Sequence, residues 1–319
     1  MHSKEVPEER TRIGKDGYLF LQFKKEGNKT VLADSFSRIP LQTLPPFYLD
    51  NSAAAYNYIL NPTGGIVGGD NLEVEIRLEP EAHAFLTTPS ATKVYKTVGP
   101  PAQQRLVFFL KRDSVLEYLP RVTIPFASSS FSQNISLFLE EGARAILLDI
   151  FNTGRKARGE HLAFNEYRSI VEAFEADLQP EQLPGQLMAL NNFLKGARSI
   201  DSYVKGARPL LSDRLLLRPH DVDYSGLGFF GAFSTTATIY LIFNEPALES
   251  SLSLLFQSIL EEQKKNKILG GVSLLPRKGL FVRILGHDAH QIEQVILLLW
   301  SIARKEMLAI YEPSLTRLF

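Results

Sequence analysis

The sequence predicts a mainly β body that is closed by a small α+β element in its C-terminal third. Between Gly17 and about Ser169, short strand-like runs follow one another, and residues 72–78 alternate strictly between apolar and polar side chains. Turn-forming Gly, Pro and Asn residues separate these runs, and no helical stretch lies between them. This pattern favours an all-β body over alternating βαβ units.

The expected strands and helices follow from local patterns. Strands are expected at residues 18–23, 72–78, 84–88, 105–110, 135–139, 145–150, 209–217, 232–243 and 281–285. A helix is expected from Pro246 to about Lys264, because proline favours the first turn of a helix and lysines favour the last. A second helix is expected over 289–308, where apolar residues recur at helical spacing: Ile292, Val295, Ile296, Leu299 and Ile302.

The chain is expected to form one β-rich domain over residues 17–319, after a flexible segment at 1–16. Residues 176–205 interrupt the strand pattern with a loop and a short amphipathic stretch, so we interpret them as an insertion. Residues 232–310 form the C-terminal strand and helix part.

Composition excludes several classes of partner and site. Lys+Arg and Asp+Glu both number 35, so no global charge attracts the chain to nucleic acid or to an anionic membrane. There is no cysteine, so a metal would be held by carboxylate, imidazole, carbonyl or water. No apolar run approaches the roughly 20 residues that span a bilayer, and the N-terminus lacks the pattern of a secretory signal. A cytoplasmic protein is expected.

Residues 61–70 read Asn-Pro-Thr-Gly-Gly-Ile-Val-Gly-Gly-Asp, with paired glycines on both sides of an Ile-Val dipeptide. Glycine allows backbone conformations that a β-carbon forbids, or a close approach of another segment. The Lys and Ser/Thr of a phosphate-binding P-loop are absent, and an alternating strand follows instead of a helix. A tight connection between two strands is therefore favoured, with Asp70 holding the turn through its own backbone.

Three acidic residues are candidates for chemistry: Asp70, Asp149 near the end of an apolar strand, and Asp213 within another. A carboxylate within an apolar strand must be solvated, paired or bound to a cation. The alternatives are a strand-end hydrogen bond for Asp149, and a turn contact or a pair with Arg214 for Asp213. His287 and His290 lie three residues apart near a helix start, a spacing more often found on a solvated helix end than in a metal site.

A basic turn follows Asp149, with cations at positions 155, 156 and 158 and then Glu160. A cluster of this kind can bind an anion, but a solvated basic rim is the more usual role. Glu160 can neutralise part of the charge. The sequence has no Ser-His-Asp order, nucleophile elbow or dinucleotide-binding glycine motif, so enzymatic signals are weak.

Several motifs in order resemble the urease accessory protein family called UreD or UreH. They cover most of the chain, from about residue 17 to 310, and lie at 61–70, 87–96, 116–120, 124–126, 149–160, 211–215, 271–273, 282–285 and Trp300. The resemblance implies a β-helical, solenoid-like body with two helices and no catalytic residue.

The resemblance also implies how such a protein acts. It would bind a UreF-type accessory protein, a UreG-type GTPase through the complex, and apo-urease, and it would hold no tightly bound cofactor. Transient Ni²⁺ would pass along an internal channel lined by Asp70, Thr92, Asp149 and Asp213, with weak metal contacts at the three aspartates. Candidates for loop or partner contacts are Gly64, Gly65, Gly68, Gly69, Lys93, Tyr95, Arg155 and Glu160.

Two other functions stay open. One is a β-rich hydrolase or lyase that uses Asp149 or Asp213 as acid or base, which would require two carboxylates about 5–10 Å apart in a cleft. The other is a pure scaffold in which the acidic residues are structural and nickel never enters.

Overall fold

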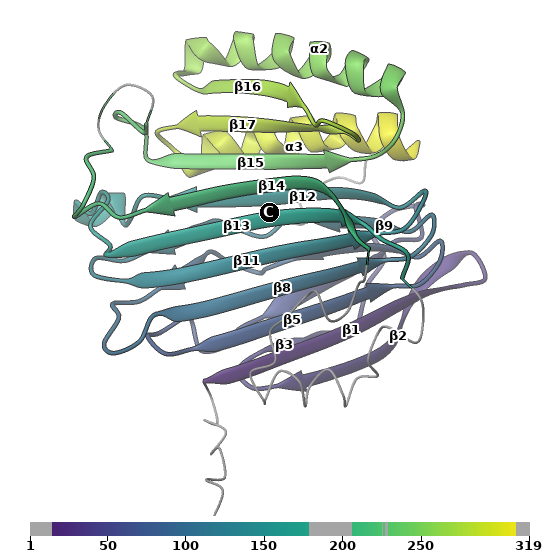
Figure 1. Ribbon diagram of the computed structural model, residues 1–319, viewed down its shortest axis with the longest axis horizontal. Helices are drawn as coiled ribbons and strands as arrows, with labels where there is room; N and C mark the ends of the chain where they lie inside the picture. The colour runs from purple at the N-terminus through teal and green to yellow at the C-terminus, as the bar shows by residue number, and fades with distance from the viewer. Residues whose placement is uncertain (1–14, 179–205, 225, 227–228, 311–319) are drawn as a thin grey trace, which may run out of the picture.

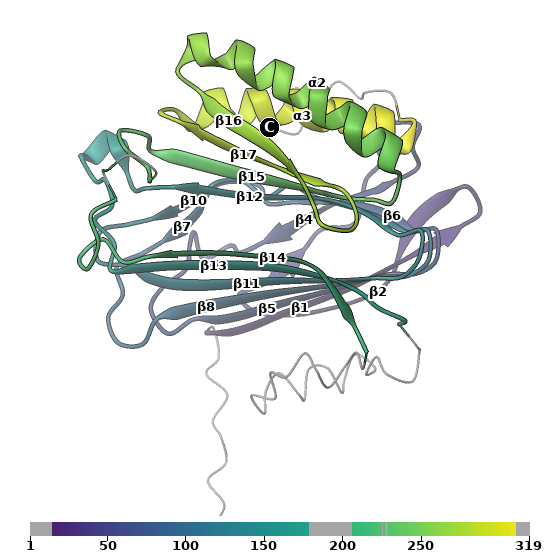
Figure 2. The same cartoon turned by 45° about the horizontal axis from the view of Figure 1, so that its top comes forward.

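Two β-sheets stacked face to face form the body of the protein, and two helices cover the outer side of one of them (Figure 1, Figure 2). The computed structural model describes residues 15–178, 206–224, 226 and 229–310. The expected flexible segment at 1–16 and the insertion at 176–205 therefore lie almost entirely outside the described residues.

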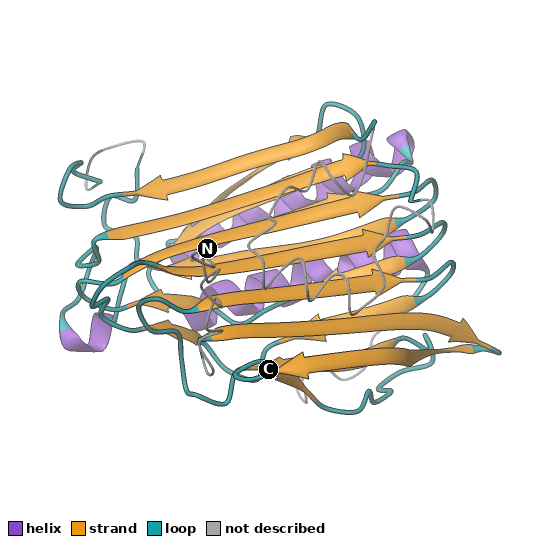
Figure 3. Ribbon diagram, turned by 60° about the horizontal axis from the view of Figure 1, so that its bottom comes forward, coloured by secondary structure: helices purple, strands orange, loops and turns teal. Residues whose placement is uncertain are grey.

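The first sheet has seven strands, seen across the front of Figure 3. Their order is β14 (Arg208–Leu217), β13 (Glu166–Glu175), β11 (Ser130–Leu139), β8 (Ala102–Leu110), β5 (Asn71–Leu78), β1 (Asp16–Glu26) and β2 (Lys29–Arg38). The strands from β13 to β1 are parallel, whereas β14 and β2 add antiparallel strands at the two edges.

The second sheet runs in the order β16 (Leu269–Leu274), β17 (Leu280–Gly286), β15 (Thr235–Ile242), β12 (Arg144–Asn152), β9 (Val115–Tyr118), β6 (His83–Thr87), β4 (Ala55–Leu60) and β3 (Gln42–Thr43). Strands β12, β9, β6 and β4 are parallel, and β15, β17 and β16 continue the sheet in antiparallel fashion.

The parallel strands are successive turns of a β-solenoid. The chain passes from the second sheet to the first and back, through β4 to β5, β6 to β8, β9 to β11 and β12 to β13, which makes four turns. Residues stack in register from turn to turn, as Ala55, Ala84, Leu116 and Ala145 do. Their side chains point inward and build the core between the sheets.

A short third side of the solenoid lies between the two sheets. Here Ile66 pairs with Val94 of β7 (Thr92–Val94), and β7 pairs in parallel with β10 (Thr123–Pro125). The Gly-rich stretch 61–70 is thus a corner that links β4 to β5 across the two sheets. The prediction of a tight connection between two strands is confirmed.

The C-terminal part places two helices on the outer face of the second sheet. Helix α2 (Pro246–Gln263) follows β15, and α3 (Ala289–Leu308) follows β17. The predicted apolar stripe of α3 is buried in a second core between this helix and the sheet, with Ile302 partly buried. Short 3₁₀ turns at Lys156–Arg158 and Lys264–Asn266 complete the structure. The mainly β, solenoid-like fold with two late helices is confirmed.

Candidate functional site

A cavity of about 300 Å³ lies between the two sheets, where β14 faces β15 and β17. Its polar lining includes Asp149, Ser169, Asp213, Arg214, Thr236, Thr238, Tyr240 and Arg283. Asp149 comes from β12 in the second sheet and Asp213 from β14 in the first, so the cavity joins two carboxylates from opposite walls.

Asp149 faces the interior because of the alternation along β12. Ala145, Leu147 and Phe151 on the same strand belong to the core between the sheets, and Asp149 continues that inward face. The sequence had suggested that Asp149 lies near the end of its strand, but the strand extends to Asn152 and Asp149 lies inside it. The carboxylate therefore opens into the cavity instead of making a strand-end contact.

Within the described residues, the groups that donate hydrogen bonds to Asp149 are neutral. Ser169 Oγ lies 2.7 Å from Asp149 Oδ2, and Gln133 Nε2 lies 3.3 Å from Oδ1. Burial raises the pKa of Asp149 above its usual range, against the two hydrogen bonds that lower it, and the charge of Asp213 raises it further. This carboxylate is thus poorly compensated in the protein alone.

Asp213, in contrast, has a cationic partner. Arg283 donates to Asp213 Oδ2, and Tyr240 Oη donates to the same oxygen at 2.6 Å. The Nε of Arg283 also lies 3.3 Å from Thr238 Oγ1. Arg214, the partner that the sequence suggested, lies instead 3.3 Å from Glu172.

Asp70 and Thr92 are not among the described residues that line this cavity. Asp70 Oδ2 accepts a hydrogen bond from the Val67 amide at 2.9 Å, and the Asp70 amide donates to the Val67 carbonyl at 3.1 Å. It holds its own turn, as the structural interpretation of the loop predicted. Thr92 lies on β7 beside Thr123, which in turn pairs with Phe151 at the cavity wall.

The glycines of the corner permit close packing of Tyr95. A β-carbon on Gly65 would lie 2.5 Å from the Tyr95 ring and 2.6 Å from the Lys93 carbonyl oxygen. Gly69 has φ of +82°, a left-handed conformation that disfavours β-carbons. Gly64 and Lys93 are exposed, whereas Gly68 is buried. A β-carbon on Gly68 would lie 3.0 Å from the Thr97 side chain and 3.1 Å from the backbone of Val98.

Tyr95 connects this corner to the basic turn. Its hydroxyl donates to the Gly64 carbonyl at 3.2 Å, and its ring packs on Phe126 at 5.1 Å. The Arg155 guanidinium lies 3.9 Å from the Phe126 ring centre and forms a two-point ion pair with Glu160. Glu160 therefore neutralises one of the three cations of the turn, in agreement with the prediction that it offsets part of the charge. The role of these residues in partner contacts stays a prediction.

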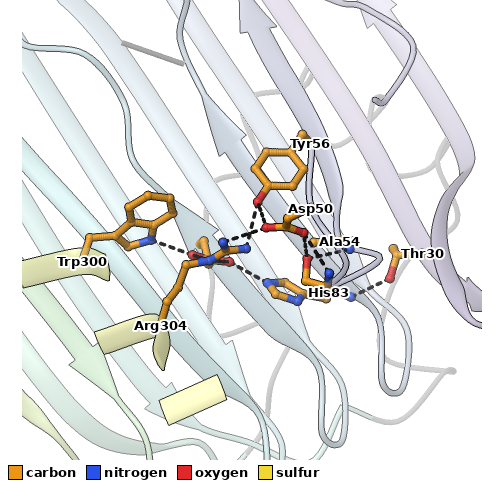
Figure 4. A network of polar contacts seen from close by, with 9 residues as sticks. Thr30, Asp50, Ala54, Tyr56, His83, Trp300 and Arg304 are labelled. Carbon is orange, nitrogen blue, oxygen red and sulfur yellow. Dashed lines mark hydrogen bonds and ion pairs between the residues drawn. The ribbon is translucent and has the colours of Figure 1, made fainter. Parts of the chain in front are cut away.

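Sequence reasoning missed a second buried acidic cluster, beneath α3 (Figure 4). Glu117 on β9 is fully buried, and its carboxylate accepts from Trp300 Nε1 at 2.6 Å and from Arg304 Nε at 2.9 and 3.0 Å. The Nε2 atom of His83 lies 2.7 Å from the same carboxylate. The in-register neighbours of Glu117 are Phe85 and Ile146, so nothing in the local pattern marks it.

The other end of Arg304 completes this cluster. Its guanidinium donates to Asp50 at 2.8 Å and to the Tyr56 hydroxyl at 2.9 Å, and Tyr56 donates to Asp50 at 2.5 Å. Burial alone would raise the pKa of Glu117, but the hydrogen bond from His83 and the charge of Arg304 outweigh it and hold that pKa below its usual range. The cluster therefore joins the first turns of the solenoid to α3.

Comparison with known proteins decides the family. A family model described as UreD urease accessory protein matches residues 15–317. The chain belongs to the UreD family. Relatives named urease accessory protein UreD include those of Lachnoclostridium phytofermentans (30% identical; 86% of this chain and 89% of the relative), Picosynechococcus sp. (27%; 94% and 91%) and Cenarchaeum symbiosum (26%; 96% and 97%).

Membership of the UreD family removes one of the alternatives. UreD proteins are non-enzymatic accessory proteins, so the hydrolase or lyase interpretation of Asp149 and Asp213 is wrong. Among residues 15–178, 206–224, 226 and 229–310, no group of three or more His, Asp or Glu side chains is arranged to hold a metal ion. His287 precedes α3 and packs on Phe233, whereas His290 lies in its first turn.

No helix in the part of the chain that the structure describes is both long and apolar enough to cross a bilayer.

Proposed function

We propose that this UreD-family chain helps to deliver Ni²⁺ to apo-urease by way of the cavity that Asp149 and Asp213 share. It would act in the cytoplasm, within a complex that contains a UreF-type accessory protein and a UreG-type GTPase. The observation that carries the proposal is the meeting of two carboxylates from opposite sheets at one cavity.

The chemistry of the lining suits passage more than storage. The oxygen donors are two carboxylates, the Ser169 and Thr238 hydroxyls and the Tyr240 phenol, and the chain has no cysteine. Oxygen ligands bind first-row divalent ions less tightly than thiolates or clustered imidazoles do. A conducted ion must leave each site as readily as it enters, so weak sites in succession are an advantage.

The poor compensation of Asp149 adds to this argument. A buried carboxylate with only neutral donors gains more from an arriving cation than one already paired with arginine. Asp149 is therefore the member of the pair whose free energy improves most when a cation enters. We place the tighter of the two weak contacts there.

Asp149→Ala and Asp213→Ala test the proposal. Each variant should assemble with the partner proteins yet give less active urease when nickel is limiting. Co-purification followed by nickel-dependent urease activation measures both properties. Asp34→Ala on β2 is a matched control, because it also removes one carboxylate and lies outside the cavity lining.

The scaffold function predicts a different result. If nickel never enters the cavity, both variants activate urease at the wild-type rate at limiting nickel. That result would disprove the nickel path and leave the protein with a scaffold role.

A further inference from the structure

We infer that Arg283 is a displaceable counter-cation that guards Asp213, and that a divalent ion entering the cavity must replace it. The inference rests on the proposed function, because it concerns how the same cavity is regulated. It is carried by the contacts of Arg283, by its exposure, and by its contrast with the other arginine that neutralises a buried carboxylate.

The position of Arg283 is fixed by strand register. Asp149 pairs with Thr238 on β15, and Thr238 pairs with Arg283 on β17, so the three residues form one row across neighbouring strands. From that row the guanidinium reaches Asp213 on the opposite sheet. A positive charge thus already occupies the place beside Asp213 that a metal ion would take.

The ion pair between Arg283 and Asp213 is weak enough to be broken by an entering cation. The Arg283 side chain is 49% exposed and that of Asp213 is 26% exposed, so water can replace either partner. Ion pairs with this exposure contribute little to stability, because solvent screens them and long side chains lose entropy in forming them. Besides this ion pair, the Arg283 side chain makes one 3.3 Å hydrogen bond to Thr238 and approaches the Phe281 ring at 5.7 Å.

Arg304 shows what a permanent counter-cation looks like in this protein. Its side chain is 2% exposed, and it bonds Glu117, Asp50 and the Tyr56 hydroxyl at once. Arg304 projects from α3 into the buried layer between this helix and the sheet, whereas the Arg283 side chain is half exposed. The difference assigns a structural role to one arginine and an exchangeable one to the other.

Competition has a measurable consequence. While Arg283 holds Asp213, an incoming Ni²⁺ must break that pair, which lowers the apparent affinity of the cavity. Because a half-exposed pair is weak, we expect its removal to tighten Ni²⁺ binding by about two- to fivefold. Arg283 would therefore lower the affinity of the cavity for Ni²⁺ without blocking the passage of the ion.

The experiment is titration calorimetry of Ni²⁺ into the full-length, metal-free protein. Arg283→Met removes the charge and keeps an apolar stem, and it should tighten binding. Arg283→Lys retains a cation and should stay near wild type. Arg214→Met is the matched control, because Arg214 lines the same cavity but lies beside Glu172, so its loss should leave the affinity nearly unchanged.

The double variant Arg283→Met/Asp213→Asn decides whether the gain passes through Asp213. Loss of the gain in that variant supports the inference. Equal affinities for Arg283→Met and wild type, with weaker binding in Asp213→Asn, would overturn the guard and leave the cavity as a cation site. A gain of the same size from Arg214→Met would also overturn it, because general charge repulsion would then explain the effect.

Failure of the proposed function is detected separately, by normal urease activation with Asp149→Ala and Asp213→Ala. Thermal melting of each variant checks folding, and a comparable melting temperature for Arg283→Met and Arg283→Lys is the expected result.

Discussion

Glu117 and Asp149 lie on neighbouring strands of one sheet and face its opposite sides. Glu117 points outward under α3, where an arginine, an indole and a histidine surround it. Asp149 points inward to a cavity, where a hydroxyl and an amide are its donors. The same sheet thus carries one carboxylate that is neutralised by cations within the fold and one whose hydrogen-bond donors among the described residues are neutral.

The difference appears in the protonation of the two groups. Both are removed from bulk water, which by itself favours the neutral acid. The cationic neighbours of Glu117 reverse that preference and lower its pKa, whereas burial prevails at Asp149 and raises its pKa. Burial of an acid therefore does not decide whether it is structural; the charge that the fold supplies beside it does.

The largest expected effect on stability is that of Arg304→Met, and the same substitution at Arg283 provides the comparison. Arg304→Met leaves Glu117 and Asp50 buried without their cation, and should lower the free energy of unfolding by about 3–5 kcal/mol. Arg283→Met breaks a half-exposed pair and should cost no more than about 1 kcal/mol. Chemical denaturation at neutral pH measures both.

Equal costs for the two arginine variants would contradict the comparison, since they would show that both clusters stabilise the fold alike. Glu26→Ala serves as a baseline, because Glu26 pairs with Lys24 at 3.6 Å and both side chains are well exposed. Its effect should stay within about 0.5 kcal/mol.

The next largest expected effect on stability comes from a purely steric change at Gly65. Gly65→Ala places a β-carbon against the Tyr95 ring and the Lys93 carbonyl, and should cost about 1–3 kcal/mol with no change in charge. Gly271→Ala on β16 meets no described atom within 4 Å and should be nearly neutral. A melting temperature for Gly65→Ala equal to that of Gly271→Ala would mean that the corner relaxes freely around its glycines.

Several strands and both helices could be predicted because they follow from local patterns in the sequence. The alternation at 72–78 indicated β5, Pro246 marked the first residue of α2, and the apolar stripe over 289–308 indicated α3 with its observed bounds. The solenoid itself came from the family resemblance. Its stacked columns mix residue types, as Tyr56, Phe85, Glu117 and Ile146 do, so no repeat is visible in a single sequence.

The candidate site was harder to predict from the sequence, because it depends on contacts between distant segments. Asp149 and Asp213 were both predicted, but their meeting depends on how two sheets stack, which no local pattern encodes. Arg283 was not predicted because its partners depend on the register between β15 and β17. The Glu117 cluster was not predicted because its contacts depend on how α3 packs on the sheet. Where the sequence did suggest a partner, it chose the neighbour Arg214, which the strand directs toward Glu172.

The smallest effect, and the most direct test of the comparison, is the pH dependence of stability in the metal-free protein. Asp149 has a raised pKa, so the folded protein binds this proton more tightly than the unfolded chain does. Stability must then fall as pH rises from the unfolded value toward the folded one. An amide at this position does not titrate, so the Asp149→Asn variant should gain stability relative to wild type as pH rises.

Glu117→Gln should show the opposite slope. The lowered pKa of Glu117 means that its contribution is present above the unfolded value and is lost as pH falls through the folded one. The variant should therefore be less stable than wild type near neutral pH and approach it in acid. Denaturant melts of both variants across about pH 3–8, with a chelator present, measure the two differences. Slopes of the same sign would show that the two carboxylates experience similar fields, and the contrast between a neutralised acid under α3 and an uncompensated one at the cavity would then be lost.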